Sequence, residues 1–272
     1  MTLVSTGWLN ENLNNVKIID CSWHMLSTQR EGYREYLQEH IPGAIFFDLD
    51  KNSEPNTDLP HMLPQSVYFH KVASNLGIAN EDKIVIYDNS DVLSACRCWF
   101  TFCYFGHEPK KLAILDGGLK KWKLEKKIVS KKIEQIRTSN YVANEQKNLV
   151  KSIKDINSNI NDQKFDVIDA RSKERFEGSE PEPRPGLRSG HIENSKNLPF
   201  VECINRTNNT FKNKMDLLKI FEKTGLNKSK NSVFTCGSGV TASVLALAFF
   251  LINDKYPPTI YDGSWSEYGK IE

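Results

Sequence analysis

Short apolar runs alternate with helical patterns along the whole chain. The runs are continuous rather than alternately polar, which is typical of strands that are buried on both faces. Helical segments between such strands are typical of parallel sheets. The pattern therefore predicts an α/β protein, with mostly parallel sheets flanked by helices. The predicted strands are VKII (16–19), KIVIY (83–87), LAIL (112–115), FDVI (165–168), SVFT (232–235) and TIY (259–261).

The second half of the chain repeats the order of the first half. Similar landmarks recur with spacings of 20, 48 and 28 residues in the first half and 22, 45 and 26 in the second. Such self-similarity indicates two copies of one domain. A lysine-rich stretch between the copies predicts a solvated linker. We therefore expect domains at 1–130 and 151–272 with a linker at 131–150. The landmarks are Asp20, His40, Asp88 and Asp116, then Asp169, His191, Cys236 and Asp262.

Composition and charge exclude several classes of protein. Hydrophobic residues make up 39% and charged residues 26% of the 272 residues, which are globular proportions. The net charge of +2 is far from the strongly basic balance that is typical of nucleic-acid-binding domains. The longest apolar run, Val244–Ile252, is about half of what a membrane-spanning helix needs. We therefore expect neither a nucleic acid nor a membrane among the partners.

The six cysteines and the N-terminus bear on the compartment. The cysteines do not form the framework of a small secreted protein. Cys96, Cys98 and Cys103 lie in an aromatic-rich apolar stretch, which favours buried thiols in a helix over a metal cluster. The first residues lack both a signal peptide and an arginine-rich presequence. A cytoplasmic location is expected, with a mitochondrial one as the alternative.

Cys236 lies between a predicted strand and a predicted helix, in the sequence CGSGVTA. Ligands of parallel sheets bind at the carboxyl ends of the strands, where this residue falls. Gly237 and Gly239 allow successive backbone N–H groups to turn inward as an anion-binding nest. The nest and the helix N-terminus favour a thiolate. An ordinary buried cysteine before a glycine-rich turn is the alternative interpretation.

The same segment, Cys236 to Ala242, resembles the active-site loop of the rhodanese superfamily, in the form found in 3-mercaptopyruvate sulfurtransferases. The resemblance covers most of the chain and includes HIPGA at 40–44 and YDGSW at 261–265. It implies two rhodanese domains, with the nucleophile only in the second, and neither metal nor organic cofactor. The second-domain counterpart of HIPG departs from the pattern and reads HIEN at 191–194. The resemblance further implies that the loop residues Gly237, Gly239, Val240 and Thr241 bind the substrate.

Arg175 and Arg184 match the two substrate-binding arginines of the family, including their nine-residue separation. The second lies in a proline-rich loop that restricts its backbone. Arginine suits bidentate binding of a carboxylate, and the implied substrate is a 2-oxo acid. From the residues alone, the alternative is that both arginines are solvated or paired with Glu180 and Glu182.

The proposed acid–histidine–serine relay of the family corresponds to Asp50, His61 and Ser238. A histidine oriented by a carboxylate and in contact with a serine hydroxyl can move protons near neutral pH. Because Asp50 and His61 fall in the first predicted domain and Ser238 in the second, we expect the site between the domains. A loop histidine with a purely structural role is the alternative.

The resemblance and these residues together imply a 3-mercaptopyruvate sulfurtransferase that carries sulfur as a Cys236 persulfide to an acceptor thiol, thioredoxin or cyanide. A thiosulfate sulfurtransferase would need cations where Gly237 and Ser238 stand. A cysteine phosphatase would need arginine at position 242, which is alanine. A non-catalytic binding module is the third alternative. Turnover of the two sulfur donors in one assay separates these functions.

Overall fold

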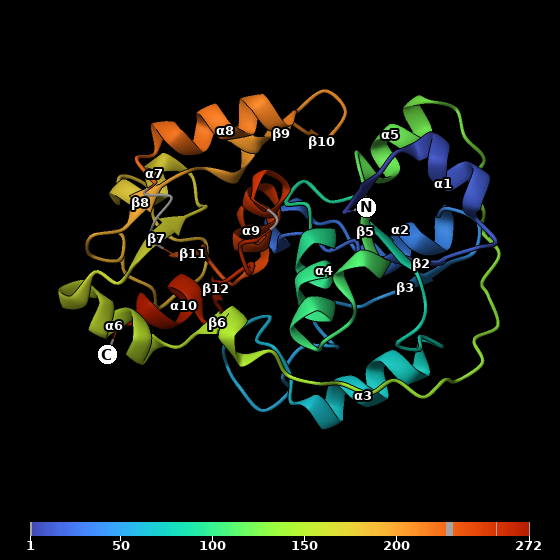
Figure 1. Ribbon diagram of the computed structural model, residues 1–272, viewed down its shortest axis with the longest axis horizontal. Helices are drawn as coiled ribbons and strands as arrows, with labels where there is room; N and C mark the ends of the chain where they lie inside the picture. The colour runs from blue at the N-terminus through green and yellow to red at the C-terminus, as the bar shows by residue number, and fades with distance from the viewer. Residues whose placement is uncertain (1, 227–230, 254, 272) are drawn as a thin grey trace. The chain divides into compact units, whose positions relative to one another are not determined.

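The computed structural model describes residues 2–226, 231–253 and 255–271 (Figure 1). The chain divides into two compact units. Unit 1 comprises residues 1–55, 63–146 and 206–210, and unit 2 comprises residues 56–62, 147–205 and 211–272. Each unit is built on one five-stranded sheet. A short segment around His61 therefore belongs to unit 2, although it is far earlier in the sequence.

The sheet of unit 1 is entirely parallel, with strand order β1-β5-β4-β2-β3. Its strands are β1 (Leu3–Val4), β2 (Lys17–Asp20), β3 (Ala44–Phe46), β4 (Ile84–Tyr87) and β5 (Leu112–Leu115). Its helices are α1 (Thr6–Asn12), α2 (Gly32–Gln38), α3 (Ser66–Asn75), α4 (Ala95–Tyr104) and α5 (Gly118–Leu124). Side chains of α1, α2 and α5 share one core cluster with alternate residues of the strands. Helix α4 contacts β4 and β5 through its own buried face.

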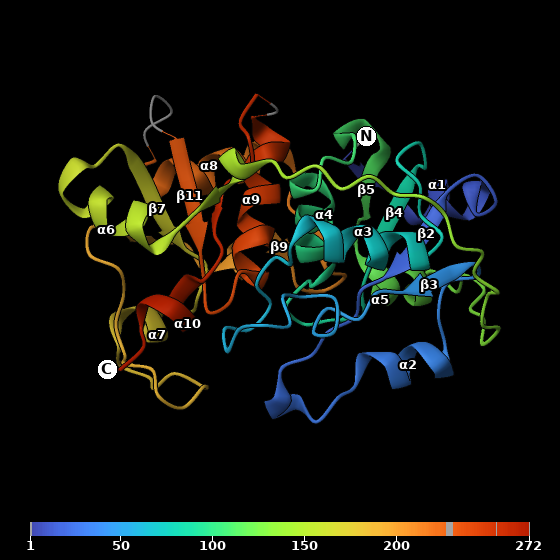
Figure 2. The same cartoon turned by 90° about the horizontal axis from the view of Figure 1, so that it is seen from below.

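Unit 2 repeats this arrangement, with the parallel order β6-β12-β11-β7-β8. Its strands are β6 (Val150–Lys151), β7 (Phe165–Asp169), β8 (Lys196–Asn197), β11 (Asn231–Thr235) and β12 (Ile260–Tyr261). Its helices are α6 (Ile153–Asp162), α7 (Lys173–Glu177), α8 (Lys214–Lys223), α9 (Val240–Ile252) and α10 (Ser264–Tyr268). Strand β11 lies between the helices α6 and α9 in Figure 2. A separate pair consists of β9 (Ile204–Asn205) and β10 (Thr210–Phe211).

The shared strand order confirms the predicted α/β fold with two similar parallel sheets. In unit 1, Asp20 is the register partner of Tyr87, and in unit 2 Asp169 is the partner of Thr235. The residues that follow these central strands, Asp88 and Cys236, are therefore equivalent positions. The predicted helix after Cys236 is also present, as α9. All three cysteines of the apolar stretch are buried in α4.

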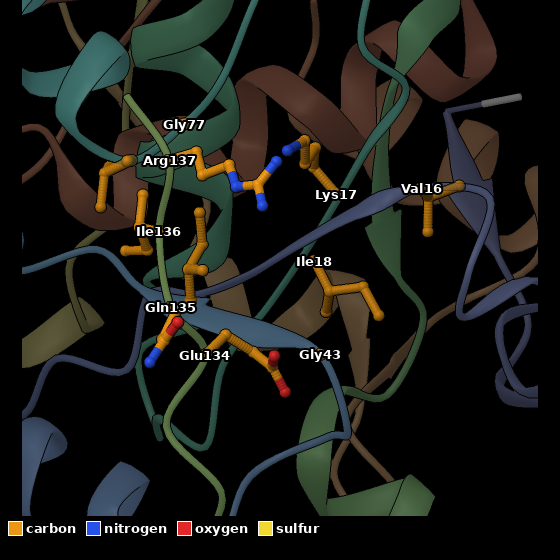
Figure 3. A pocket seen from close by; sticks show the side chains of 11 residues that line it. Val16, Lys17, Ile18, Gly43, Gly77, Glu134, Gln135, Ile136 and Arg137 are labelled. Carbon is orange, nitrogen blue, oxygen red and sulfur yellow. The ribbon is translucent and has the colours of Figure 1, made fainter. Parts of the chain in front are cut away.

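Residues 131–146, most of the predicted linker, form no helix or strand and belong to unit 1. Tyr141 anchors this segment, because its fully buried ring packs edge-on against Phe69 and stacks with His107. Burial raises the pKa of Tyr141 above its ordinary value. The segment also borders a pocket of about 320 Å³ beside the first residues of β2 (Figure 3). There Arg137 and Lys17 point toward one another, and none of the predicted site residues lines this pocket.

Among the described residues, no helix combines the length and the apolar character that crossing a bilayer requires.

Candidate active site

Cys236 occupies the turn between the central strand β11 and helix α9. Its side chain is almost fully buried, with 2% of the residue exposed. Gly239 caps α9 with φ of 78°, a left-handed conformation that disfavours a side chain. Four residues thus reverse the chain from strand to helix, and the thiol is set beside the helix N-terminus. This location matches the one predicted from the sequence.

The loop is held in shape by the hydroxyl of Ser264, which begins α10. Its Oγ accepts hydrogen bonds from the N–H groups of Cys236 at 3.2 Å and Gly239 at 3.1 Å. The same hydroxyl donates to the carbonyl of Tyr261 at 2.8 Å. Ser264 is fully buried and has φ of 50°, so its backbone is in the left-handed region as well. One side chain therefore ties both ends of the cysteine loop to the next strand of the sheet.

The loop carbonyls are bound by the two residues that follow Ser264. Trp265 N–H donates to the carbonyl of Cys236 at 2.9 Å. Ser266 donates to the carbonyl of Gly237 twice, from its N–H at 2.9 Å and its Oγ at 2.6 Å. In the part of the chain that the structure describes, the N–H groups of Gly237 and Ser238 donate to no protein acceptor. With the carbonyls turned away, these donors can stabilise negative charge.

Ser238 connects the loop to two further predicted site residues within unit 2. Its Oγ lies 2.9 Å from His61 Nδ1 and accepts a hydrogen bond of 3.4 Å from Arg184 Nη2. His61 is 5% exposed and has φ of 60°. Strained backbone of this kind persists only where the surroundings enforce it. Two of the three members of the predicted relay are therefore in contact.

The third member, Asp50, belongs to unit 1. Both of its carboxylate oxygens accept hydrogen bonds from Trp23 Nε1, at 3.1 and 3.0 Å. Its predicted role in orienting His61 stays a prediction.

The two predicted substrate arginines converge on Gly237. A Cβ atom placed on this glycine would lie 3.3 Å from Arg175 Nη2 and 3.5 Å from Arg184 Nη1. Both guanidinium groups therefore lie directly beside the cysteine loop. Arg175 also pairs with Glu182, as the alternative interpretation of the sequence held, whereas Glu180 is exposed. The pairing leaves part of the guanidinium of Arg175 unbound, so binding to a substrate remains open to it.

Behind Arg175 lies a buried ion-pair network that the sequence analysis did not identify. The guanidinium of Arg171 donates three hydrogen bonds to Asp169, of 2.6 to 3.1 Å, and one of 2.7 Å to Glu182. Burial lowers the pKa of Arg171, but the bonds to Asp169 outweigh it and the net pKa is raised. The guanidinium of Arg171 also packs over Trp265, 4.4 Å from the ring centroid. The network thus joins the end of β7 to the segment that holds the cysteine loop.

Unit 1 has a different chemistry at the equivalent loop. The carboxylate of Asp88, which takes the place of the cysteine, accepts from the N–H groups of Ser90 at 3.0 Å and Ala95 at 2.7 Å. Burial raises the pKa of Asp88 to about 7, against the lowering effect of these two bonds. The first loop therefore satisfies its own donors with its own side chain, and it has no thiol at this position.

Several residues of the site could not be identified from local sequence. Ser264 and Trp265 belong to the YDGSW motif, which contributes to the family resemblance but indicates no role for either residue, and Ser266 lies just outside it. The signal for Ser264 was the repeated DG dipeptide before α5 and α10, which marks a turn at the end of a strand. The sequence does not show that Glu182, rather than Glu180, is the buried partner of Arg175.

The family model for the rhodanese-like domain matches residues 5–125 and again residues 152–270. The chain therefore belongs to the rhodanese family, with two copies of its domain. It is 40% identical to the mitochondrial thiosulfate/3-mercaptopyruvate sulfurtransferase 1 of Arabidopsis thaliana, over 98% of this chain and 75% of that protein. It is 36% identical to the 3-mercaptopyruvate sulfurtransferase of Homo sapiens, over 98% and 91%.

The crystal structure of SseA from Escherichia coli, described as a 3-mercaptopyruvate sulfotransferase, superposes with a TM-score of 0.87. The two chains are 32% identical, and the match covers 98% of this chain and 100% of that one. The thiosulfate sulfurtransferase of Rattus norvegicus is 34% identical over 98% of this chain and 91% of its own length.

Proposed function

We propose that the chain is a 3-mercaptopyruvate sulfurtransferase. The observation that carries the proposal is the convergence of Arg175 and Arg184 beside Gly237, one residue from the buried Cys236. Two guanidinium groups next to a thiol suit a donor that carries a carboxylate close to its sulfur. The relatives named for this activity, at 36 and 40% identity, support the same assignment.

The reaction follows from the placement of these groups. The Cys236 thiolate attacks the sulfur of 3-mercaptopyruvate, and an S–S bond forms while the C–S bond breaks. The bonding electrons leave with the carbon as the enolate of pyruvate, which takes up the proton of the substrate thiol. Cys236 then carries one extra sulfur as a persulfide. The N–H groups of Gly237 and Ser238 would stabilise the charge on this outer sulfur.

His61 and Ser238 are placed to move the proton. The serine hydroxyl accepts from Arg184, so its own proton is available to the His61 nitrogen at 2.9 Å. Proton transfer by a positioned histidine is the usual form of general acid–base catalysis near neutral pH. Asp50 would complete this relay by orienting His61.

The second half of the cycle passes the outer sulfur to an acceptor. A thiol or cyanide attacks it and restores the Cys236 thiolate, which makes the cycle a two-step, ping-pong reaction. Reduced thioredoxin is the protein acceptor that we propose, and the cytoplasm is the proposed location, with the mitochondrion as the alternative.

Thiosulfate is the competing sulfur donor. The relative at 40% identity is named for both donors, and the thiosulfate sulfurtransferase of Rattus norvegicus is 34% identical. A dianionic donor would favour cations in the loop, whereas Gly237 and Ser238 are neutral. A non-catalytic binding protein is disfavoured, because it would not need a nucleophile beside two arginines.

One assay distinguishes these functions. Turnover of 3-mercaptopyruvate and of thiosulfate is measured side by side, with wild-type protein and with Cys236→Ser. We expect mercaptopyruvate to be the better donor and Cys236→Ser to be inactive with both, because a hydroxyl cannot form the persulfide. Mass spectrometry after donor treatment should show about 32 Da added to the Cys236 peptide, the mass of one sulfur atom. Sulfur on another cysteine, or a preference for thiosulfate, contradicts the proposal.

A further inference from the structure

We infer that Glu182 is a positioning residue of this site, which turns Arg175 so that the outer edge of its guanidinium faces the cysteine loop. The inference rests on the proposed function, since it concerns how the donor carboxylate is held. Glu182 itself would not touch the substrate. Its contribution would be the direction in which Arg175 points.

Glu182 binds one complete edge of the Arg175 guanidinium. Its Oε1 accepts from Nε at 3.2 Å and its Oε2 accepts from Nη2 at 2.6 Å. This side-on, two-bond geometry is the one that fixes the plane of an arginine as well as its position. The carboxylate of Glu182 is 1% exposed, whereas the side chain of Arg175 is 20% exposed. The buried partner therefore holds the more accessible one.

Glu182 is itself fixed from behind. Its Oε1 accepts a further bond of 2.7 Å from Nη1 of Arg171, whose side chain is fully buried. Arg171 is anchored in turn to Asp169 at the end of β7 and to the carbonyl of Gly190 at 2.8 Å. Pro181 and Pro183 flank Glu182 and restrict the backbone on both sides. The carboxylate is thus tied to the central sheet rather than to a free loop.

The edge of Arg175 that Glu182 leaves open is the one between Nη1 and Nη2. A guanidinium offers two bidentate edges, and the Nε–Nη2 edge is already used. The shared atom Nη2 lies nearest to the position that a Cβ of Gly237 would take, at 3.3 Å. The open edge thus includes an atom that lies beside the cysteine loop, and a carboxylate there could accept two parallel bonds from it.

Charge and geometry predict opposite effects when Glu182 is changed. Asp169, Arg171, Glu182 and Arg175 alternate in sign, so together they are neutral. Loss of the Glu182 charge makes the surroundings of Cys236 more positive, which by Coulomb attraction alone would favour an anionic reagent. Loss of the two-bond contact releases Arg175, which would disfavour that reagent. The sign of the effect therefore distinguishes a positioning residue from a mere charge.

The test compares the rates at which iodoacetate and iodoacetamide alkylate Cys236, followed on the Cys236 peptide by mass spectrometry. The reagents differ mainly in the carboxylate, so the ratio of their rates reports how well a carboxylate is held beside the thiol. Glu182→Gln removes the charge, and Glu182→Asp keeps the charge but retracts the carboxylate. We expect the ratio to fall about tenfold in both variants, the least that losing a charged hydrogen bond costs. The KM for 3-mercaptopyruvate should rise in parallel.

Glu180→Gln is the matched control, because it removes the same charge two residues away from an exposed position. It should leave the ratio unchanged. A ratio that rises in Glu182→Gln and stays constant in Glu182→Asp overturns the inference, and so does a ratio that neither variant changes. Should Glu182→Gln fail to fold by near-ultraviolet circular dichroism, Glu182→Asp decides alone.

Failure of the proposed function looks different. A wild-type protein that prefers iodoacetate but does not turn over 3-mercaptopyruvate overturns the function and leaves the role of Glu182 in place. Normal turnover that is insensitive to both Glu182 variants overturns only the role of Glu182.

Discussion

His61 Nδ1 lies 2.9 Å from Ser238 Oγ, although 177 residues separate the two in the sequence. A hydrogen bond of 3.4 Å from Arg184 reaches the same serine oxygen. Arginine can only donate, so the hydroxyl accepts from Arg184 and has its proton free to donate to the histidine. Ser238 therefore contacts both Arg184, a cation that could hold a substrate, and His61, a base that could move a proton.

This contact predicts that His61 and Ser238 act as a unit. We expect His61→Ala and Ser238→Ala each to lower kcat for 3-mercaptopyruvate by about 100-fold, the lower range for general acid–base catalysis. The double variant should be little worse than either single one, because each change already breaks the same pair. Steady-state kinetics of all four proteins measures the coupling. Losses that simply multiply would mean that the contact has no part in catalysis.

Arg184→Lys should weaken catalysis even though it keeps the positive charge, because an ammonium cannot reproduce the bidentate fork. A cost of about 1.5–3 kcal/mol corresponds to a 10- to 150-fold loss in kcat/KM for 3-mercaptopyruvate. The change should lie mainly in KM if the carboxylate is bound equally in the ground and transition states. A donor without a carboxylate is the control and should lose less. Unchanged kinetics with Arg184→Lys and with Arg175→Lys would show that neither guanidinium holds the carboxylate of the donor.

The loop sequence should decide which sulfur donor is used. The double variant Gly237→Arg, Ser238→Lys adds two cations and removes the hydroxyl that contacts His61. It also places a side chain where the two guanidinium groups now meet Gly237, at 3.3 and 3.5 Å from the new Cβ. We expect kcat/KM to rise for thiosulfate and to fall for 3-mercaptopyruvate, each by about tenfold. If the ratio of kcat/KM for the two donors does not change, residues outside this loop determine which donor is used.

The buried carboxyls of unit 1 should make stability depend on pH. Burial raises the pKa of Asp20 to about 6 and that of Asp88 to about 7, from an ordinary value of 3.8. The folded protein therefore binds more protons than the unfolded chain between these values, so their contribution to stability is lost as pH rises toward 7. Asp88→Asn mimics the protonated carboxyl, so it should remove the contribution of Asp88 to the pH dependence of stability.

The measurement is the free energy of unfolding of both proteins from pH 4 to pH 8. The value for Asp88→Asn minus that for wild type should increase by on the order of 4 kcal/mol as the pH rises from 4 to above 7. The difference isolates Asp88 from the other carboxyls, including Glu35, for which burial favours a higher pKa but bonds from Arg30 and Asn89 give a lowered one. A difference that is constant with pH would contradict the raised pKa.

The central strands could be read from the sequence, because each is a continuous apolar run that is buried on both faces. The edge strands could not: β1, β6 and β8 have two residues each and β3 has three, too few for a pattern. The helix predicted after Cys236 is α9, which extends from Val240 to Ile252.

The loop that carries the nucleophile could also be predicted from the sequence, because its glycines and its place after a strand are local properties. The residues that hold the site depend on contacts between distant segments. Only the structure shows that Glu182, and not Glu180, binds Arg171 and Arg175. Ser264 is likewise recognised only once its hydroxyl is seen to accept from Cys236 and Gly239.

The hydrogen bonds that hold the N–H groups of Cys236 and Gly239 and the carbonyls of Cys236 and Gly237 all come from residues made after the loop. Ser264, Trp265 and Ser266 supply them, and they follow Cys236 by about 30 residues in the order of synthesis. While the ribosome exit tunnel still covers these three residues, the loop has neither its N–H donors arranged nor its carbonyls bound. The loop around the reactive thiol is thus completed only after residues 264–266 have left the ribosome, and a nascent chain that stops short of Ser264 presents a cysteine without these bonds.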